Sequence, residues 1–255
     1  MRQILSTAAL HLSIVRPEQR EFYHHHATQL QSDAAAEFNA ITYKLDETNI
    51  LPAFLVSTLI GIHNFTETFS FREDNFNSTL DGLLRCIHLM RGIKSIIGRW
   101  WSFLLASDLK PILEAATARR DVGRGLKHKF DDLERLIQQA DISSATCAMY
   151  RETIGELEDL MVSQVMLNDL QVTESANMIF AWLVVVPHGY MENLSARRPE
   201  ALIILAYYAV ILHYRRKFWA VGDSGEYLIR GISAHLGRHW DEYLAWPRSM
   251  LEKDQ

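Results

Sequence analysis

Apolar residues recur every three or four positions along most of the chain, the spacing that brings side chains to one face of an α-helix. The first run is Ile4, Leu5, Ala8 and Leu12, and it predicts an amphipathic helix at the very start of the sequence. Serine, threonine and histidine interrupt this run and no small-residue cleavage site follows, so we do not expect a signal peptide. A chain that starts directly with a helix is expected to begin inside a domain.

Three more segments show the same helical spacing before residue 105. A helix is predicted over about Glu18 to Leu45, with its apolar positions at Phe22, Leu30, Ala34, Phe38, Ile41 and Leu45. Asn49 is expected to cap a third helix that runs to about His63. A long apolar pattern extends from Asn75 to Leu105, where Gly92 and Gly98 are expected to bend or break the helix.

One stretch, residues 114–129, is charged, contains glycine and is poor in large apolar side chains. We expect it to be a surface loop joining two halves of one helical array and not a domain boundary. Beyond it the helical period returns, and one helix is expected to be capped by Thr173 and ended by Pro187. Alternating patterns with Gly/Asn turns are lacking, so the predicted fold is all-α, a single array of about ten helices over residues 1–255 without significant β-sheet.

The most apolar segment runs from Ala201 to Leu212, twelve residues without a charge. At about 1.5 Å per residue it spans roughly 18 Å, against about 30 Å for a bilayer core. Pro199 suits the first turn of a helix, and the cations of residues 215–217 suit its C-terminal end. Apolar residues on every face indicate a helix surrounded by protein, so we expect a core helix and no membrane span.

Composition excludes several classes of function. The net charge of −5 over 255 residues argues against a general nucleic-acid-binding surface, so no direct nucleic-acid contact is expected. Cys86 and Cys147 are the only cysteines, too few for a zinc finger or an iron–sulfur site. Two thiols in a chain of this length also suit a reducing compartment.

Histidine patterns give little reason to expect a metal. Three consecutive residues on a helix point about 100° apart, so the side chains of residues 24–26 cannot converge on one ion. His235 and His239 are four positions apart, but Gly237 between them is expected to end the helix. We therefore predict no metal site.

An all-α chain with an apolar interior could also be an isoprenoid-processing enzyme, which needs carboxylates one helical turn apart to hold magnesium. Asp131 and Asp132 are followed at that spacing by the cation Arg135, and the Asn168–Asp169 pair lacks the required hydroxyl. Phosphate loops, nucleophile elbows and dinucleotide fingerprints are missing from the sequence. We therefore expect no enzyme activity, no catalytic residues and no cofactor.

Aromatic residues are concentrated in the last third of the chain. They are Phe180, Trp182, Tyr190, Tyr207, Tyr208, Tyr214, Phe218, Trp219, Tyr227, Trp240, Tyr243 and Trp246. One interpretation is a well-packed aromatic core. The other is an apolar ligand cavity with a few polar groups at its mouth.

The order of several motifs resembles a known family. "ILSTAALHLSIVRP", "FLVSTLIGIHNF", "LMRGIKSIIGRWW", "FAWLVVVPHGYMENLSARRPEALIILAYYAVILH", "FWAVGDSGEYLIRGI" and "WDEYLAWP" together resemble the C-terminal regulatory, ligand-sensing domain of fungal binuclear zinc-cluster transcription factors of the sterol uptake control type. The resemblance covers nearly the whole chain and is strongest from Phe180 to Pro247. The family's DNA-binding zinc cluster needs six cysteines and is absent from this chain.

The resemblance implies an all-helical homodimer that binds a sterol or another lipid and regulates transcription of lipid or secondary-metabolite genes. It implies a nuclear location, with a cytoplasmic one for the ligand-bound state. By motif, the implied ligand-binding residues are Phe180, Trp182, Tyr207, Tyr208, His213, Phe218 and Trp219, with Gly222 and Gly225 in a loop that closes the pocket. The acidic Asp223 in that loop leaves the ligand open, and a ligand-free dimerisation or co-regulator scaffold is the alternative.

Overall fold

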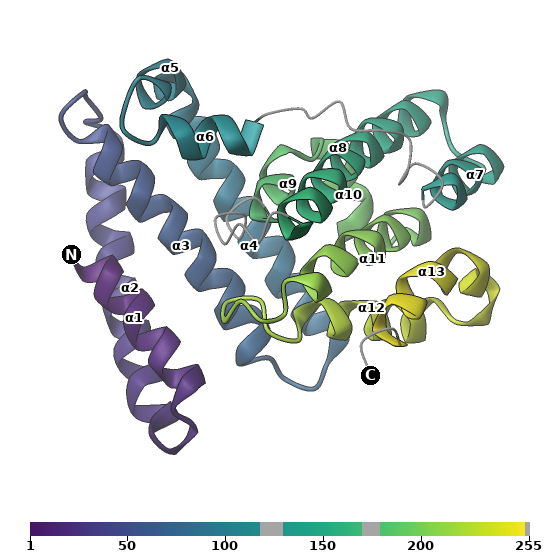
Figure 1. Cartoon of the computed structure of the whole chain (residues 1–255), viewed down its shortest axis with the longest axis horizontal. Helices are drawn as coiled ribbons and strands as arrows, with labels where there is room; N and C mark the ends of the chain where they lie inside the picture. Colours follow the sequence, from purple (N-terminus) through teal and green to yellow (C-terminus); the bar gives the residue numbers. More distant parts are fainter. Residues whose placement is uncertain (118–129, 170–178, 253–255) are drawn as a thin grey trace. The chain divides into compact units, whose positions relative to one another are not determined.

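A computed structural model describes residues 1–117, 130–169 and 179–252. Thirteen α-helices lie within these ranges, which contain no β-strand (Figure 1), so the all-α prediction is confirmed. The number exceeds ten because the long predicted segments are divided into shorter helices. Thr173, the predicted cap, lies outside the described residues.

The chain divides into two compact units, Met1–Ala115 and Ala116–Gln255. The division falls inside the segment that the sequence predicts as a surface loop, residues 114–129, of which residues 118–129 lie outside the described ranges. A single domain over residues 1–255 stays a prediction. We describe each unit by itself.

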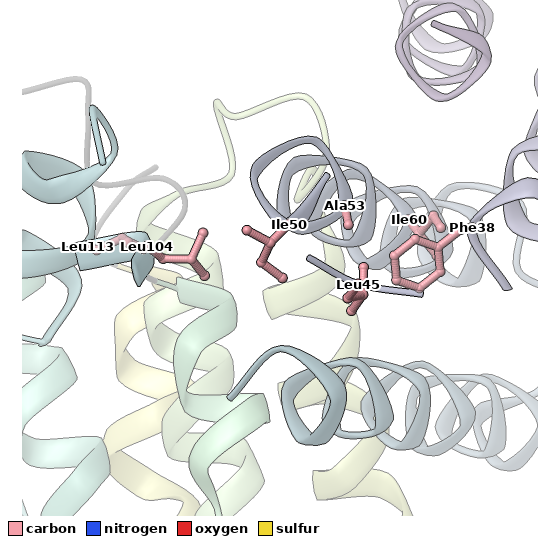
Figure 2. Close-up of a cluster of buried hydrophobic side chains, with 7 residues drawn as sticks. All are labelled: Phe38, Leu45, Ile50, Ala53, Ile60, Leu104 and Leu113. Carbon is pink, nitrogen blue, oxygen red and sulfur yellow. The ribbon is translucent and has the colours of Figure 1, made fainter. Parts of the chain in front are cut away.

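Unit 1 is built from six helices. They are α1 (Arg2–Val15), α2 (Arg20–Thr42), α3 (Ile50–Ser70), α4 (Phe76–Ile97), α5 (Trp101–Leu105) and α6 (Lys110–Thr117). Figure 1 shows α1 lying along α2. A core cluster of buried apolar side chains joins α2, α3, α5 and α6 (Figure 2); it consists of Phe38, Leu45, Ile50, Ala53, Ile60, Leu104 and Leu113.

Helix α1 packs with the opposite face from the one that its sequence suggests. Ile4 and Leu5 are 58% and 50% exposed, whereas Gln3, Ser6 and Ser13 are buried. The predicted helix is therefore present, with the start of its apolar run exposed. Its polar face is buried because neighbouring helices supply hydrogen-bond partners for it, which offsets the cost of removing those groups from water.

The partners of α1 come from α2 and α3. The Ser6 hydroxyl donates to the carbonyl oxygen of Ala27 at 2.9 Å and lies 3.1 Å from Nδ1 of His63. The Gln3 amide donates to Oε1 of Gln31 at 2.7 Å. His63 is buried, and this burial, with a smaller effect from the charge of His24, lowers its pKa to about 4. A neutral imidazole therefore belongs to the folded state near neutral pH.

Other expectations for unit 1 are met in part. Helix α2 is present as predicted, and of the apolar positions that predicted it Phe38 is buried whereas Phe22 and Ile41 are exposed. Asn49 does precede α3, although its side chain accepts from the backbone N–H of Asp46 and donates to Lys44 instead of capping the helix. A 3-10 turn at Gly98–Trp100 ends α4, as predicted for that glycine, whereas Gly92 lies inside the helix.

Length and composition alone would allow one helix among the described residues, α3, to cross a membrane. Half of its most apolar 18-residue window is buried within the protein, which is also how the core helix of a water-soluble domain behaves.

The described part of unit 2 contains seven helices. They are α7 (Asp131–Gln139), α8 (Ser144–Asp169), α9 (Ile179–Val185), α10 (His188–Ser195), α11 (Pro199–Tyr214), α12 (Ser224–Leu236) and α13 (Asp241–Glu252). Every residue of α11 from Glu200 to His213 is buried, which confirms the predicted core helix. Pro199 occupies its first turn, and α9 ends before Pro187, also as predicted.

Candidate functional site

The candidate site is centred on α11, because this helix carries Tyr207, Tyr208 and His213 and precedes the turn with Phe218 and Trp219. All faces of α11 are apolar, so neighbouring helices pack around it on every side. Consecutive side chains on a helix point about 100° apart. The two tyrosines therefore enter different surroundings.

Tyr208 belongs to a tryptophan cluster, which we define as Trp182, Tyr190 and Tyr208. The rings of Trp182 and Tyr208 stack with centroids 4.6 Å apart and planes 18° apart, and Tyr190 meets Trp182 edge-on at 5.6 Å. The polar atoms of all three are satisfied by backbone carbonyls: Trp182 donates to Thr153, Tyr190 to Ala201 and Tyr208 to Ile179, at 3.0–3.3 Å. The cluster thus joins α8, α9, α10 and α11 into one packed layer.

Tyr207 belongs to a second group, the Phe130 cluster, formed by Phe130, Tyr207 and Trp246. Ring centroids of Tyr207 and Trp246 are 4.8 Å apart, and Phe130 lies within 6.2 Å of both rings. This cluster connects α11 to α13 and to the residue that precedes α7. Sequence analysis missed Phe130, because nothing in its neighbourhood along the chain distinguishes it from other apolar positions.

Among the described residues of unit 2, buried polar atoms without a hydrogen-bond partner include the hydroxyls of Tyr150, Tyr207 and Ser224 and Oε2 of Glu200. Burial, and then the negative charge of Glu200, raises the pKa of Tyr150 well above its ordinary value. Burial, and then Asp132, raises the pKa of Tyr207 in the same direction. Both phenols are therefore neutral hydrogen-bond donors at physiological pH, and neither is an acid–base group.

The segment after α11 forms a series of tight turns. The backbone N–H of Phe218 donates to Arg215 at 2.8 Å, and the N–H of Gly222 donates to Phe218 at 3.1 Å. Phe218 and Trp219 are half-buried and meet edge-on at 6.0 Å. Gly222 has φ +51°, a left-handed conformation that glycine adopts without a steric cost.

Gly225 does not lie in the loop, because α12 begins one residue earlier, at Ser224. The predicted position of Gly225 in the closing loop is wrong. A Cβ atom added to it would lie 2.4 Å from the backbone nitrogen of His213 and 2.5 Å from the carbonyl oxygen of Ala209. This glycine therefore lets α12 cross α11 at backbone contact.

The structure thus distributes the predicted ligand-binding residues over three places. Trp182 and Tyr208 touch each other, with Phe180 buried two positions before Trp182 on the same helix. Tyr207 lies in the Phe130 cluster. His213 is buried where α12 crosses α11, and Phe218, Trp219 and Gly222 form the turn between these helices. Ligand binding by these residues stays a prediction.

A surface hollow that sequence analysis did not predict lies in unit 1, between the second half of α3 and the first half of α4. Its volume is about 490 Å3, and its lining includes Glu67, Phe71, Arg85 and Cys86. Oε1 of Glu67 lies 2.7 Å from Nε2 of His24, whose ring stacks on Phe71 at 3.7 Å. Burial raises the pKa of Cys86 to about 12, so its thiol is not a nucleophile at neutral pH.

The histidines and the acidic pairs do not come together as a metal site among the described residues. Within residues 1–117, 130–169 and 179–252, no three histidine, cysteine, aspartate or glutamate side chains are arranged to hold an ion. Gly237, with φ +71°, ends α12 as predicted and separates His235 from His239. Asp132 pairs with Arg135 at 2.8 Å, as expected for a solvated helix face.

Comparison with known proteins gives one informative similarity. The chain is 22% identical over 261 residues to a Zn(2)-C6 fungal-type transcription factor of Gibberella zeae. This similarity supports the resemblance of the chain to fungal transcription factors. The alignment covers 96% of this chain but 51% of the relative, so the chain spans about half the length of the curated protein that it matches.

Two other comparisons returned nothing: no protein-family model matches the chain, and no solved structure matches it significantly. The matched relative is described as a transcription factor. The sterol-uptake subtype is a finer assignment than this similarity supports.

Proposed function

We propose that this chain is the regulatory part of a fungal transcription factor of the sterol uptake control type. It acts in the nucleus as a homodimer and controls lipid or secondary-metabolite genes. The observation that carries the proposal is the similarity to a Zn(2)-C6 transcription factor along 96% of the chain. The net charge of −5 agrees with a part that regulates transcription without contacting DNA itself.

The signal to which it responds is an apolar ligand, a sterol or another lipid. Support comes from the chemistry around α11, where aromatic rings gather and the buried polar atoms without a partner include the neutral hydroxyls of Tyr150 and Tyr207, beside the single carboxylate of Glu200. The ligand would act by a population shift, favouring one arrangement of α11, the following turn and α12 over another. It can do so only through a difference in affinity for the two arrangements. The cytoplasmic location belongs to the ligand-bound state in this proposal.

A second candidate function is a ligand-free dimerisation or co-regulator scaffold. The observation in its favour is that Trp182 and Tyr208 stack directly on each other and are both almost completely buried. In this arrangement each ring occupies the space where a ligand would contact the other. Binding near them would require the two rings to separate.

Mass spectrometry of the purified chain under native conditions tests the proposal. A sensor is expected to retain a lipid from the expression host or to bind an added sterol, with a rise in Tm of several degrees at a ligand concentration 100 times the Kd. A fatty acid and a water-soluble steroid glucuronide serve as controls for chain length and charge. A chain that retains no lipid and whose Tm is unchanged by sterols would favour the scaffold.

A further inference from the structure

Helix α1 leaves an apolar stripe uncovered. We define the α1 stripe as Met1, Ile4, Leu5, Ala8, Leu12 and Val15. Four of its members are at least half exposed: Met1, Ile4, Leu5 and Val15. The opposite face of the helix contains the fully buried Leu10 and is held to α2 and α3 by the hydrogen bonds of Gln3 and Ser6. A row of exposed apolar side chains on a helix fixed through its polar face is typical of an interaction surface.

Apart from Leu5, the members of the stripe are spaced symmetrically about Ala8. Met1, Ile4, Ala8, Leu12 and Val15 are separated by three, four, four and three positions, so the pattern is identical when read in either direction. A two-fold axis through Ala8 would pair Ile4 with Leu12 of a second copy and Met1 with Val15 of that copy. Such self-complementarity is what a symmetric dimer interface requires, and the small side chain at its centre allows close approach of the two helices.

We propose that α1 pairs in antiparallel orientation with α1 of a second copy of this chain, with the two-fold axis at Ala8. The proposal rests on the homodimer of the proposed function and assigns its surface. Antiparallel pairing also brings the N-terminal end of each helix beside the C-terminal end of the other, where their dipoles attract.

Charge does not oppose this pairing. Between Arg2 and Arg16, α1 contains no aspartate, glutamate, lysine or arginine. Both arginines are engaged within their own chain, Arg2 with Glu37 and Arg16 with the hydroxyl of Tyr23 at 3.3 Å. The α1 stripe can therefore be buried in a dimer without leaving an unpaired charge, which would be the main cost of such an interface.

The area of contact between the two α1 helices, which we call the seam, sets the expected affinity of the dimer. Helix α1 has 14 residues and is about 21 Å long, so a seam one helix wide covers on the order of 800 Å2 in total. Stable interfaces bury about 1,200–2,000 Å2. The dimer is thus a weak, reversible one, and its measurement needs protein concentrations up to about 100 μM.

Sedimentation equilibrium of the full chain between 1 and 100 μM is the first test. Wild type is expected to approach twice the 29.4 kDa of one chain as its concentration rises. Ile4→Lys, at an exposed position, should keep the fold and raise the dimer Kd by about 100-fold. Leu55→Lys is the matched control, because Leu55 is an exposed apolar residue of α3 outside the stripe and its replacement should leave the Kd unchanged. A monomeric wild type at 100 μM, or an equal response of both variants, would overturn the proposal.

Disulfide trapping tests the two-fold axis separately. Ala8→Cys, in a Cys147→Ser background, should form an interchain disulfide on mild oxidation, because the axis brings two copies of position 8 together. Leu55→Cys in the same background should not. The remaining native thiol, Cys86, is buried. Equal cross-linking of both variants, or none of Ala8→Cys, would contradict the antiparallel pairing. Neither measurement depends on a lipid, so failure here leaves the ligand proposal intact.

Discussion

Trp182 and Tyr208 stack face to face, with ring centroids 4.6 Å apart, although 26 positions separate them in the chain. Through this contact, α9 packs against the central helix α11. Tyr208→Ala should lower the free energy of unfolding by about 3–5 kcal/mol, because it removes a large side chain from a filled interior. Chemical denaturation measures the change. A loss below about 1 kcal/mol would mean that the ring already borders empty space, as a ligand cavity would provide.

The adjacent tyrosines of α11 should respond differently to loss of their hydroxyls. The Tyr208 hydroxyl donates to the carbonyl of Ile179 at 3.0 Å, so Tyr208→Phe should cost about 1 kcal/mol. The Tyr207 hydroxyl is buried without a partner, so Tyr207→Phe should be neutral or stabilise the protein by up to about 1 kcal/mol. Denaturation curves of the two variants form a matched pair. A larger loss for Tyr207→Phe than for Tyr208→Phe would contradict the assigned hydrogen bonds.

Gly222, in the turn before α12, and Gly225, in the first turn of α12, are predicted to be needed for different reasons. Gly225→Ala should destabilise by several kcal/mol, because its Cβ would meet the backbone of α11 and nothing nearby can move aside. Gly222→Ala should cost about 1–2 kcal/mol, since only its left-handed φ opposes a side chain and no atom lies within 4 Å of the added carbon. Thermal unfolding of both variants shows which substitution costs more stability. Equal costs would show that helix contact at Gly225 is not the constraint.

A lid function of the turn makes a separate prediction for Gly222. Gly222→Asp should change the response to lipid while the domain stays folded, because the turn adjusts to a bulky acidic residue at a left-handed position. Circular dichroism verifies the fold, and lipid affinity is compared with that of wild type. An unchanged affinity in a folded variant would count against a lid.

Acid should weaken unit 1 through His63. Its folded pKa of about 4 is below the ordinary value of 6.5, so the folded state binds fewer protons than the unfolded one as pH falls. The stability that this histidine contributes is complete above pH 6.5 and is lost between pH 6.5 and 4, by roughly 3 kcal/mol. Denaturation of wild type and His63→Gln across this range isolates the effect. Parallel pH profiles for the two proteins would contradict it.

How much of this architecture can be read from sequence differs between helices. The core helix α11 was predictable because its apolar residues cover every face, which leaves one environment for it. Helix α1 was predicted as a helix, but the face that it buries was not. Its orientation depends on hydrogen-bond partners such as Gln31 and His63, which come from distant positions and cannot be read from the local pattern.

The candidate site was predictable to a similar degree. Aromatic residues of the last third do gather around α11, but periodicity could not show that Tyr207 and Tyr208 enter separate clusters. The requirement for glycine at position 222 follows from a turn, which sequence suggested. The requirement at position 225 follows from the crossing of two helices, which only the folded backbone reveals.

The central claim is that this chain regulates transcription in response to a lipid. The most direct measurement joins the chain to an unrelated DNA-binding domain and records a reporter gene in fungal cells with normal and depleted sterol. The account predicts reporter activity that changes several-fold between the two conditions. This change should disappear in a folded variant that no longer binds lipid. Activity equal to that of the DNA-binding domain alone, in both conditions, would contradict it.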